Sequence, residues 1–531
     1  MNVKSFDVVN LLKPDVLVCD YLNQEKKLTP FFNGSVSELE LIHDAGSMNF
    51  SLSKRNVLVD VLHQQYRKIT VHQSVNANID SFLGNKTFTV STGHQLCLLT
   101  GPLYFIYKIA STIKLAQILS ETNRELHFVP VFWMATEDHD FEEVNHAFLY
   151  DEKIEWQTQR KGAVGELSLE SLSSTLQSLE TILKIDSDKN DILNIIHNAY
   201  KLENLADATR YLVNALFGQY GLVIVDANHR SLKAEFIDIL KSELLLCTSF
   251  NAVTETNEKL SQLGYKPTVN PRAINLFYLN EGMRERIVKS EDDSWSVLNT
   301  DIRWNQTELI ALLQDHPEKF SPNVLLRPLY QECILPNLAY IGGPGELAYW
   351  LQLKSTFDAH NVKFPKLLLR DSAILLSEKA SSLLMKLNLS FDELFEDEHT
   401  IQKRIVGGDD VSLAEEKSNL ELLMSVVAEK VKTVDSTLET SVGADARKII
   451  GMLEHLEKKM IRALKTKEEV KLKQLEKLLI EIFPEGVLQE RHDNLFQYST
   501  QFDGDLIGEL ISQFNPLKNE LHVFELPVRK S

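Results

Sequence analysis

The fold is constrained most by a strand, a turn and a helix that follow one another in residues 87–108. Phe88 and Val90 alternate with polar residues, as in a β-strand. A turn with Gly93 follows. Thr100-Gly101-Pro102 then predicts a helix start, because proline at a first helical turn removes no intrahelical hydrogen bond. The free N–H groups of that helix point toward the turn, where open α/β sheets bind anions and nucleotides. The glycine spacing matches neither a dinucleotide fingerprint nor a P-loop, so a turn without a ligand is an equal interpretation of this stretch alone.

A second strand is predicted at His127–Ala135, where a continuous apolar run is typical of a parallel strand covered on both faces. A strand, a helix and a second strand at this separation form a βαβ unit, which is almost always right-handed. Residues 136–146 follow directly. They therefore lie at the carboxyl end of a buried strand, where α/β proteins place their sites.

Residues 137–143 form the strongest chemical signal in the chain. They hold five carboxylates and His139, and His146 follows. Packing so many carboxylates together is unfavourable unless a cation, a substrate amine or helix N-termini compensate their charge. If the chain is helical from Phe141 onward, His139, Glu143 and His146 share one face and could bind a divalent metal. The alternative interpretation is a solvated acidic helix start capped by Asp140.

Basic residues and glycines recur near later predicted strands. GLVIVD at 221–226 is a third strand. The turn at 340–346, which contains Gly342, Gly343 and Gly345, precedes a helix over 347–360. A last strand at 366–370 ends in Arg370. Lys108, Arg327 and Arg370 are therefore predicted ligands for phosphate or carboxylate groups.

The C-terminal third has a different pattern. Apolar residues step by four and three in a heptad seam formed by Leu420, Met424, Val427, Val431, Val434 and Leu438. A second helical run follows Gly443, so residues 411–440 and 445–480 predict an antiparallel helical hairpin that pairs with a second copy. The tail carries a polar group of residues at 489–494, and Val523–Pro527 is predicted to be an edge strand.

These patterns predict an α/β protein in four parts. Residues 1–85 are an N-terminal extension packed on the core, and residues 86–380 are the core. The core contains a helical insertion near 150–215 and a second insertion near 265–320. Residues 381–482 form the helical coiled-coil domain, and residues 483–531 return to the core.

Composition excludes several classes of protein. The chain has a formal charge of −19 and no Lys/Arg cluster, which argues against a nucleic-acid partner. No apolar run approaches the roughly 20 residues of a membrane span, and the N-terminus lacks a signal-peptide hydrophobic region. The four cysteines are far apart and form no C-x-x-C, which argues against a zinc ribbon or a disulfide framework. We therefore expect a cytoplasmic protein.

Five segments, taken in order, resemble those of the BshC family, the cysteine ligases of bacillithiol synthesis. The segments are TGHQLCLLTGPLYFIYK at 92–108, VPVFWMATEDHDFEEVNH at 129–146, AYIGGPGELAYW at 339–350, FPKLLLRDS at 364–372 and FPEGVLQERHDN at 483–494. The resemblance implies a Rossmann-like parallel-sheet core, related to class I nucleotidyltransferases, with connecting insertions and a C-terminal coiled coil that forms a homodimer.

The resemblance also implies a ligase that joins L-cysteine to glucosaminyl-malate through an amide. This reaction needs ATP, with or without Mg²⁺, to activate the cysteine carboxylate, and a base for the attacking amine. Asp138, His139 or Asp140 is the expected base. His94 stands where class I nucleotidyltransferases carry a signature histidine, and we expect it to bind phosphate or the leaving group. Substrate or nucleotide binding is expected from Thr92, Gly93, Gln95, Thr100, Gly101, Tyr104, Lys108, Glu137, His146, Arg327, Gly342, Gly343, Gly345, Glu346, Arg370, Asp371, Gln489, Arg491 and Asn494.

Two other functions remain open at this point. One is a metal-dependent hydrolase or transferase that uses His139, Glu143 and His146. The other is a coiled-coil protein whose core binds ligands without catalysis. The succession of polar residues at strand ends favours an enzyme.

Overall fold

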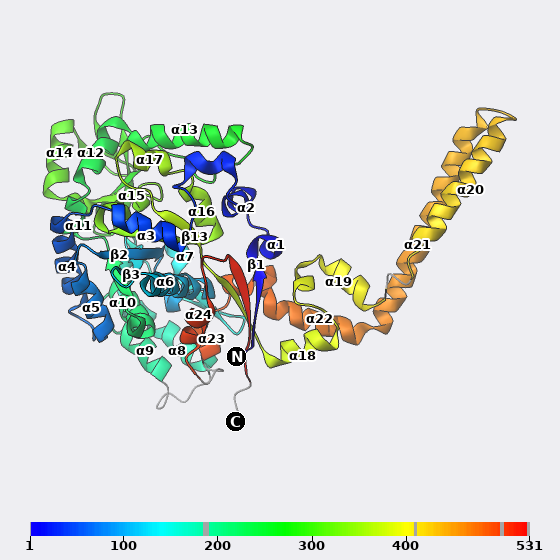
Figure 1. Ribbon diagram of the computed structural model, residues 1–531, viewed down its shortest axis with the longest axis horizontal. Helices are drawn as coiled ribbons and strands as arrows, with labels where there is room; N and C mark the ends of the chain where they lie inside the picture. The colour runs from blue at the N-terminus through cyan, green and yellow to red at the C-terminus, as the bar shows by residue number, and fades with distance from the viewer. Residues whose placement is uncertain (1, 184–190, 408–410, 500–503, 528–531) are drawn as a thin grey trace. The chain divides into compact units, whose positions relative to one another are not determined.

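The computed structural model describes residues 2–183, 191–407, 411–499 and 504–527 of the 531-residue chain. The chain forms two compact units (Figure 1). The first contains residues up to Leu375 and Gln489–Phe524, and the second contains Leu376–Leu488 with Glu525–Pro527.

The first unit is built on a parallel sheet of five strands in the order β13-β12-β2-β3-β6. Their bounds are Thr87–His94 (β2), His127–Met134 (β3), Val223–Asp226 (β6), Asn337–Gly342 (β12) and Lys366–Leu369 (β13). In chain order this arrangement is 5-4-1-2-3, the doubly wound pattern of dinucleotide-binding folds. The predicted Rossmann-like core is therefore confirmed.

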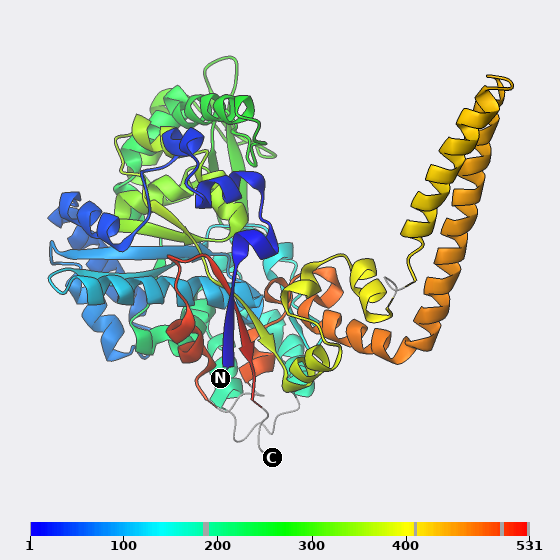
Figure 2. The same cartoon turned by 45° about the vertical axis from the view of Figure 1, so that its right-hand side comes forward.

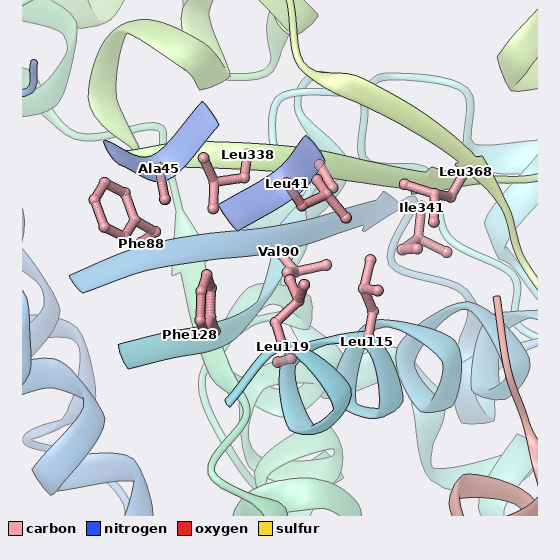
Figure 3. Packing of buried hydrophobic residues seen from close by; sticks show 12 residues of the cluster. Leu41, Ala45, Phe88, Val90, Leu115, Leu119, Phe128, Leu338, Ile341 and Leu368 are labelled. Carbon is pink, nitrogen blue, oxygen red and sulfur yellow. The ribbon is translucent and has the colours of Figure 1, made fainter. Parts of the chain in front are cut away.

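Helix α6 (Leu103–Thr122) connects β2 to β3 and follows Pro102, as the sequence predicted. It packs on the sheet beside α3 (Glu38–Ser47). Apolar side chains of both helices meet side chains of four strands in one buried cluster (Figure 3). Leu115 and Leu119 of α6 lie against Val90 and Phe128, and Leu41 of α3 lies beside Ile341. Burial of this apolar area holds the helix against the strands.

The N-terminal region contributes α2 (Val16–Leu22), α4 (Leu52–Tyr66) and α5 (Gln73–Ser81) to the same unit. The buried Arg55 donates hydrogen bonds to the carbonyls of Phe82 and Thr87, and the Tyr66 hydroxyl accepts from the N–H of Ile224 in β6. These contacts fix the N-terminal helices to the central sheet.

Two insertions separate strands of the sheet. The first contains the hairpin β4 (His146–Leu149) and β5 (Glu152–Glu155), followed by α8 (Ser173–Leu183), α9 (Asp191–Tyr200) and α10 (Leu205–Phe217). The second follows α11 (Arg230–Ala234), α12 (Ile237–Leu246) and α13 (Thr248–Gln262). It is an antiparallel sheet in the order β10-β9-β8-β7-β11, with α14 (Gln306–Asp315) between β10 and β11. Its strands are β7 (Leu276–Asn280), β8 (Met283–Lys289), β9 (Trp295–Val297), β10 (Arg303–Trp304) and β11 (Phe320–Pro322).

The strand at 366–370 is not the last, contrary to prediction. β14 (Ser372–Leu376) follows it, and β15 (Glu520–Glu525) lies between β14 and β1 (Asn2–Asp7) in a sheet of three strands. The C-terminal segment is therefore a central strand rather than the predicted edge strand. The sequence did not show this because the partner strand is the first segment of the chain.

The second unit is helical. It contains α18 (Glu378–Lys386), α19 (Glu398–Ile405), α20 (Ala414–Lys432), α21 (Leu438–Lys467) and α22 (Glu469–Ile482). Helices α20 and α21 lie side by side along their length (Figures 1 and 2), and Lys417 pairs with Glu457 at 2.8 Å between them. This confirms the helical hairpin.

The turn of that hairpin is not where the sequence placed it. The chain reverses at residues 433–437, where Asp435 accepts from the N–H of Thr437, and Gly443 lies inside α21. One glycine costs a helix only about 1 kcal/mol, which packing against α20 offsets. Val434, a predicted seam residue, is therefore in the turn and 82% exposed.

Candidate active site

The strands of the central sheet end at one edge, where the residues that follow them line a cavity of about 790 Å³. Gly93 and His94 come from the end of β2, Glu137 and Asp138 from the loop after β3, and residues 343–346 from the turn after β12. β2 lies next to β12, and the chain leaves these two strands toward opposite ends of the sheet. This is the topological switch point, where open α/β sheets bind their ligands.

An ion pair between a buried lysine and a partly buried glutamate connects the two strand ends at the switch point. Lys108 in α6 is 3% exposed. Its Nζ lies 2.6 Å from Oε2 of Glu346 and also donates to the Gly93 carbonyl. Glu346 in addition accepts from the N–H of Gly343 (2.9 Å) and from the hydroxyl of Tyr340 (2.6 Å). Burial raises the pKa of the Glu346 carboxyl, but Lys108 and the Gly343 N–H outweigh this effect and keep the pKa below its usual value. The pair therefore fixes the glycine turn against β2.

The carboxylates after β3 are compensated by cations of the protein itself. Oε1 of Glu137 lies 2.5 Å from Nζ of Lys233, which is fully buried in α11. Oδ2 of Asp138 accepts from Nε2 of Gln95 (2.8 Å), and Arg284 lies 3.6 Å from its Oδ1. Burial acts to raise the pKa of Asp138, but hydrogen bonds from His139 and Gln95 and the charge of Arg284 hold it well below its usual range. Both carboxylates are therefore part of ion pairs at neutral pH.

His94 is uncharged in this site. Burial, and then the nearby charge of Lys108, lowers the pKa of the imidazole to about 4. Its Nδ1 lies 3.0 Å from the Gln95 carbonyl, which can only accept a hydrogen bond, so Nδ1 carries the proton. The lone pair of Nε2 is then available to accept a proton or a hydrogen bond.

The lining of the cavity is strongly basic. Seven basic residues line it against three acidic ones, Glu137, Asp138 and Glu346. The basic residues are Lys108, Arg272, Arg284, Arg286, Arg327, Arg370 and Arg491. Arg272, Arg286 and Arg491 form no ion pair with any residue of the described part of the chain. An excess of unmatched guanidinium groups in a concave site favours phosphate and carboxylate ligands.

Four of these cations and ion-pair partners were not selected from the sequence. Arg272, Arg284 and Arg286 come from the second insertion, and Lys233 comes from α11. Arg284 and Arg286 are two residues apart in β8, so their side chains leave the same face of the strand. That spacing after the Gly282 turn was the available signal.

Arg370 is held by an acidic partner from the C-terminal segment. It forms two hydrogen bonds with Glu490, of 2.8 and 2.6 Å. Its Nε is buried and makes no hydrogen bond to any described residue. Gly343 lies beside this atom, since a Cβ built on Gly343 would be 3.8 Å from it. Arg370 therefore has one N–H, next to the glycine turn, that no described residue accepts from.

A smaller cavity of about 360 Å³ adjoins the large one and shares Gln95, Tyr104 and Arg491 with it. Its other lining residues are Cys97, Pro102, Glu143, His146, Ala147, Phe148 and His492. His146, which the sequence placed in the site, lies here rather than in the large cavity. Nε2 of Gln95 also donates to Oε2 of Glu143 at 2.5 Å, so one amide group connects a carboxylate of each cavity.

Several predicted site residues are used for structure instead. The Thr92 hydroxyl donates to the carbonyl of Ile341 in the neighbouring strand. Asn494 donates to the carbonyls of Leu99 and Gly101, and Gln489 pairs with the backbone of Leu375. Asp371 accepts from the Ser111 hydroxyl. None of these residues lines either cavity, and neither do Thr100, Gly101, Gly342, His139 and Asp140.

The predicted metal-binding triad does not form. Helix α7 (Phe141–Val144) ends before His146, which begins β4. Nδ1 of His139 instead lies 2.8 Å from Arg284, and Glu143 binds Gln95. Within the described ranges, no group of three His, Cys, Asp or Glu residues is arranged to hold a metal ion. The short helix therefore separates residues that a longer helix would have placed on one face.

The fold and the site together define a Rossmann-like α/β protein with an arginine-rich cavity at the carboxyl edge of its sheet. Two family models match the chain. Residues 1–371 match the N-terminal Rossmann-like domain of bacillithiol biosynthesis BshC, and residues 373–526 match its C-terminal coiled-coil domain. The chain belongs to the BshC family.

Relatives named "Putative cysteine ligase BshC" are similar over nearly the whole chain. The protein from Christiangramia forsetii is 40% identical, with 98% of each chain covered. The protein from Flavobacterium psychrophilum is 41% identical over 94% of this chain and 95% of its own. The protein from Bacillus licheniformis is 30% identical over 92% and 94%. In the part of the chain that the structure describes, no helix is both long enough and apolar enough to span a membrane.

Proposed function

We propose that this protein is an ATP-dependent ligase that joins the carboxyl group of L-cysteine to the amine of glucosaminyl-malate, the last step of bacillithiol biosynthesis. The observation that carries the proposal is the basic cavity at the switch point of a BshC-family chain. Both a polyphosphate and the two carboxylates of a malate group need several cations in one concave site. Arg272 and Arg286, which form no ion pair with any described residue, meet part of this need.

Two features of the cavity support a nucleotide as the ligand. The glycine turn after β12 brings backbone close to the cavity, and a Cβ at Gly345 would meet nothing within 4 Å. Beside this turn lies the buried Nε of Arg370, which makes no hydrogen bond to any described residue. ATP supplies the activation of the cysteine carboxylate. Arg327 and Arg370 are proposed to hold the phosphates of ATP. Asp138 would supply a carboxylate ligand for Mg²⁺ bound to those phosphates.

Proton transfer is the second requirement of the reaction, because the attacking amine must lose a proton. His94 is the proposed base, since its Nδ1 carries the proton and the lone pair of its Nε2 can accept one. Nδ1 of His139 already accepts a hydrogen bond from Arg284, whose guanidinium can only donate. Protonation of Nδ1 would therefore break this hydrogen bond. Asp138 is proposed to orient Gln95 and Arg284 rather than to take the proton.

The proposal includes a homodimer in the cytoplasm, where ATP and cysteine are available. Helices α20 and α21 expose an apolar stripe that consists of Leu422, Leu423, Val426, Ile449, Met452 and Leu456. Exposed apolar residues on a long helical hairpin are typical of a surface that a second copy covers.

The test of the reaction is a thiol profile of a strain that lacks this protein. We expect glucosaminyl-malate to accumulate and bacillithiol to disappear, both measured by mass spectrometry. The wild-type gene should restore the thiol and Arg284→Met should not. Arg160→Met is the matched control, because Arg160 is exposed and lines neither cavity. An unchanged thiol profile in the deletion strain would refute the ligase assignment.

A further inference from the structure

The smaller cavity has the right charges for a zwitterion. It is lined by one acidic residue, Glu143, and by one guanidinium, Arg491, and both are exposed to the cavity without an ion-pair partner among the described residues. Its volume of about 360 Å³ suits a molecule with few heavy atoms rather than a nucleotide. An α-amino acid carries the two complementary charges, a carboxylate and an ammonium group, on one carbon atom.

The rest of the wall is mixed, because the polar side chains of Gln95, Tyr104, His146 and His492 line it beside apolar ones. Ala147 and Phe148 of β4 contribute to it together with Pro102. Cys97 is buried, and burial raises the pKa of its thiol to about 12, so it stays protonated at neutral pH. It therefore adds a soft, weakly polar surface of the kind on which a small thiol side chain packs well.

The two cavities meet at a wall that fixes the orientation of the ligand. Arg491 lines both cavities, whereas Glu143 lines only the smaller one. A carboxylate bound to Arg491 thus faces the boundary with the large cavity, and an ammonium group bound to Glu143 remains in the smaller cavity. Gln95 holds Glu143 in place through its Nε2.

We propose that this smaller cavity is the subsite for the amino-acid substrate, with the carboxylate on Arg491, the ammonium group on Glu143 and the thiol against Ala147 and Phe148. This inference rests on the proposed ligase function. It adds a reason for selectivity: an amine kept protonated by Glu143 is not a nucleophile, so the amine of the bound amino acid does not take the place of the acceptor amine. Glu143 is then a substrate-binding residue, and Gln95 is a positioning residue.

The test measures binding to the purified full-length protein by isothermal titration, with and without the non-hydrolysable nucleotide AMP-PNP and Mg²⁺. The ligands are L-cysteine and 3-mercaptopropionate, which has the same carboxylate and thiol but no amine. We expect Glu143→Gln to weaken L-cysteine binding by about tenfold or more and to leave 3-mercaptopropionate binding unchanged, because only the contact with the amine is lost. Glu142→Gln is the matched control, since Glu142 is exposed and lines neither cavity.

A second variant, Ala147→Leu, fills the cavity and should block both ligands while AMP-PNP still binds. The subsite is refuted if Glu143→Gln leaves L-cysteine binding unchanged, if it weakens both ligands equally, or if the wild type binds no L-cysteine in either condition. These outcomes are independent of the thiol profile. If the protein binds amino acids at this cavity but the thiol profile of the deletion strain is unchanged, the ligase reaction is refuted and the amino-acid subsite is still supported.

Discussion

Arg370 and Glu490 form a bidentate ion pair in the interior of the first unit, with N–O distances of 2.8 and 2.6 Å. Their side chains are only 3% and 2% exposed. Arg370 follows β13, whereas Glu490 comes from the segment that follows the whole helical unit in the chain. The pair therefore ties the returning C-terminal segment to the edge of the sheet where the candidate site lies.

Removing one partner of this pair should be costly. Glu490→Gln leaves a buried guanidinium without its counter-charge, and we expect a loss of about 3 kcal/mol or more in the free energy of unfolding. Removing both charges in Arg370→Met/Glu490→Leu should cost less than the single change. Urea denaturation of the first unit, followed with Glu121→Gln on the exposed side of α6 as control, measures both. A single variant as stable as the control would contradict the buried pair.

The Lys108–Glu346 pair should control nucleotide affinity through the glycine turn. Lys108→Met leaves the partly buried Glu346 without its cation and frees residues 343–345 from β2, so we expect AMP-PNP to bind at least about tenfold more weakly. Lys114→Met, on the same helix, removes a lysine whose Nζ donates to the exposed carbonyl of Ser512 and lies outside both cavities. Titration calorimetry compares the two. Equal affinities in both variants would show that the pair does not position the turn.

Glu332 should make stability depend on pH. It is buried in α15 (Arg327–Ile334), where its Oε1 accepts from Gln331 and Asn337, and burial raises its pKa from 4.5 to about 8. The folded state thus holds the proton more tightly than the unfolded chain. This stabilisation is complete below about pH 4.5 and is lost as the pH rises through about 8.

We expect Glu332→Gln to match the wild type at pH 5 and to exceed its stability at pH 9 by about 1 to 3 kcal/mol, because the amide keeps an oxygen acceptor and cannot ionise. Urea denaturation at pH 5, 7 and 9 measures the difference. A constant difference across these pH values would mean that Glu332 does not titrate between them.

Gly101 should not tolerate a side chain. Its φ is +65°, and a Cβ there would lie 2.7 Å from Cβ of Cys97. We expect Gly101→Ala to destabilise the first unit by about 2 kcal/mol or more, since strain and steric overlap add. Gly46→Ala in α3 is the control, because its Cβ would meet nothing within 4 Å, and it should leave the melting temperature the same or raise it. Calorimetric melting temperatures that fall equally in both variants would be inconsistent with this geometry.

The apolar stripe on α20 and α21 predicts a dimer. Light scattering of the purified wild-type protein should give twice the mass of one chain. The double variant Leu423→Glu/Met452→Glu should have the mass of a single chain, because a charge buried in an apolar interface is not compensated. Ser425→Glu adds a charge on the same helix outside the stripe and should remain dimeric. A wild-type protein that is monomeric at micromolar concentration would exclude this interface.

The sequence by itself determined the layered core and much of the site. Alternating or continuous apolar runs mark strands, and parallel strands bring their carboxyl ends to one edge, so residues after different strands are predicted to meet. For this reason His94, Lys108, Asp138, Arg327 and Glu346 could be selected together, and all of them line one cavity. The helical hairpin followed from its heptad spacing in the same way.

Only the tertiary structure decided what each polar group binds. Arg284 and Arg286 enter the site because an antiparallel insertion folds over it, and no local pattern encodes where such a sheet packs. Conversely, Gln489 and Asn494 are residue types that often bind ligands, but here their side chains form hydrogen bonds with backbone carbonyls and amides. The physical reason is range: periodicity depends on neighbouring residues, whereas the partner of a buried charge or amide comes from wherever folding brings an opposite group within about 3 Å.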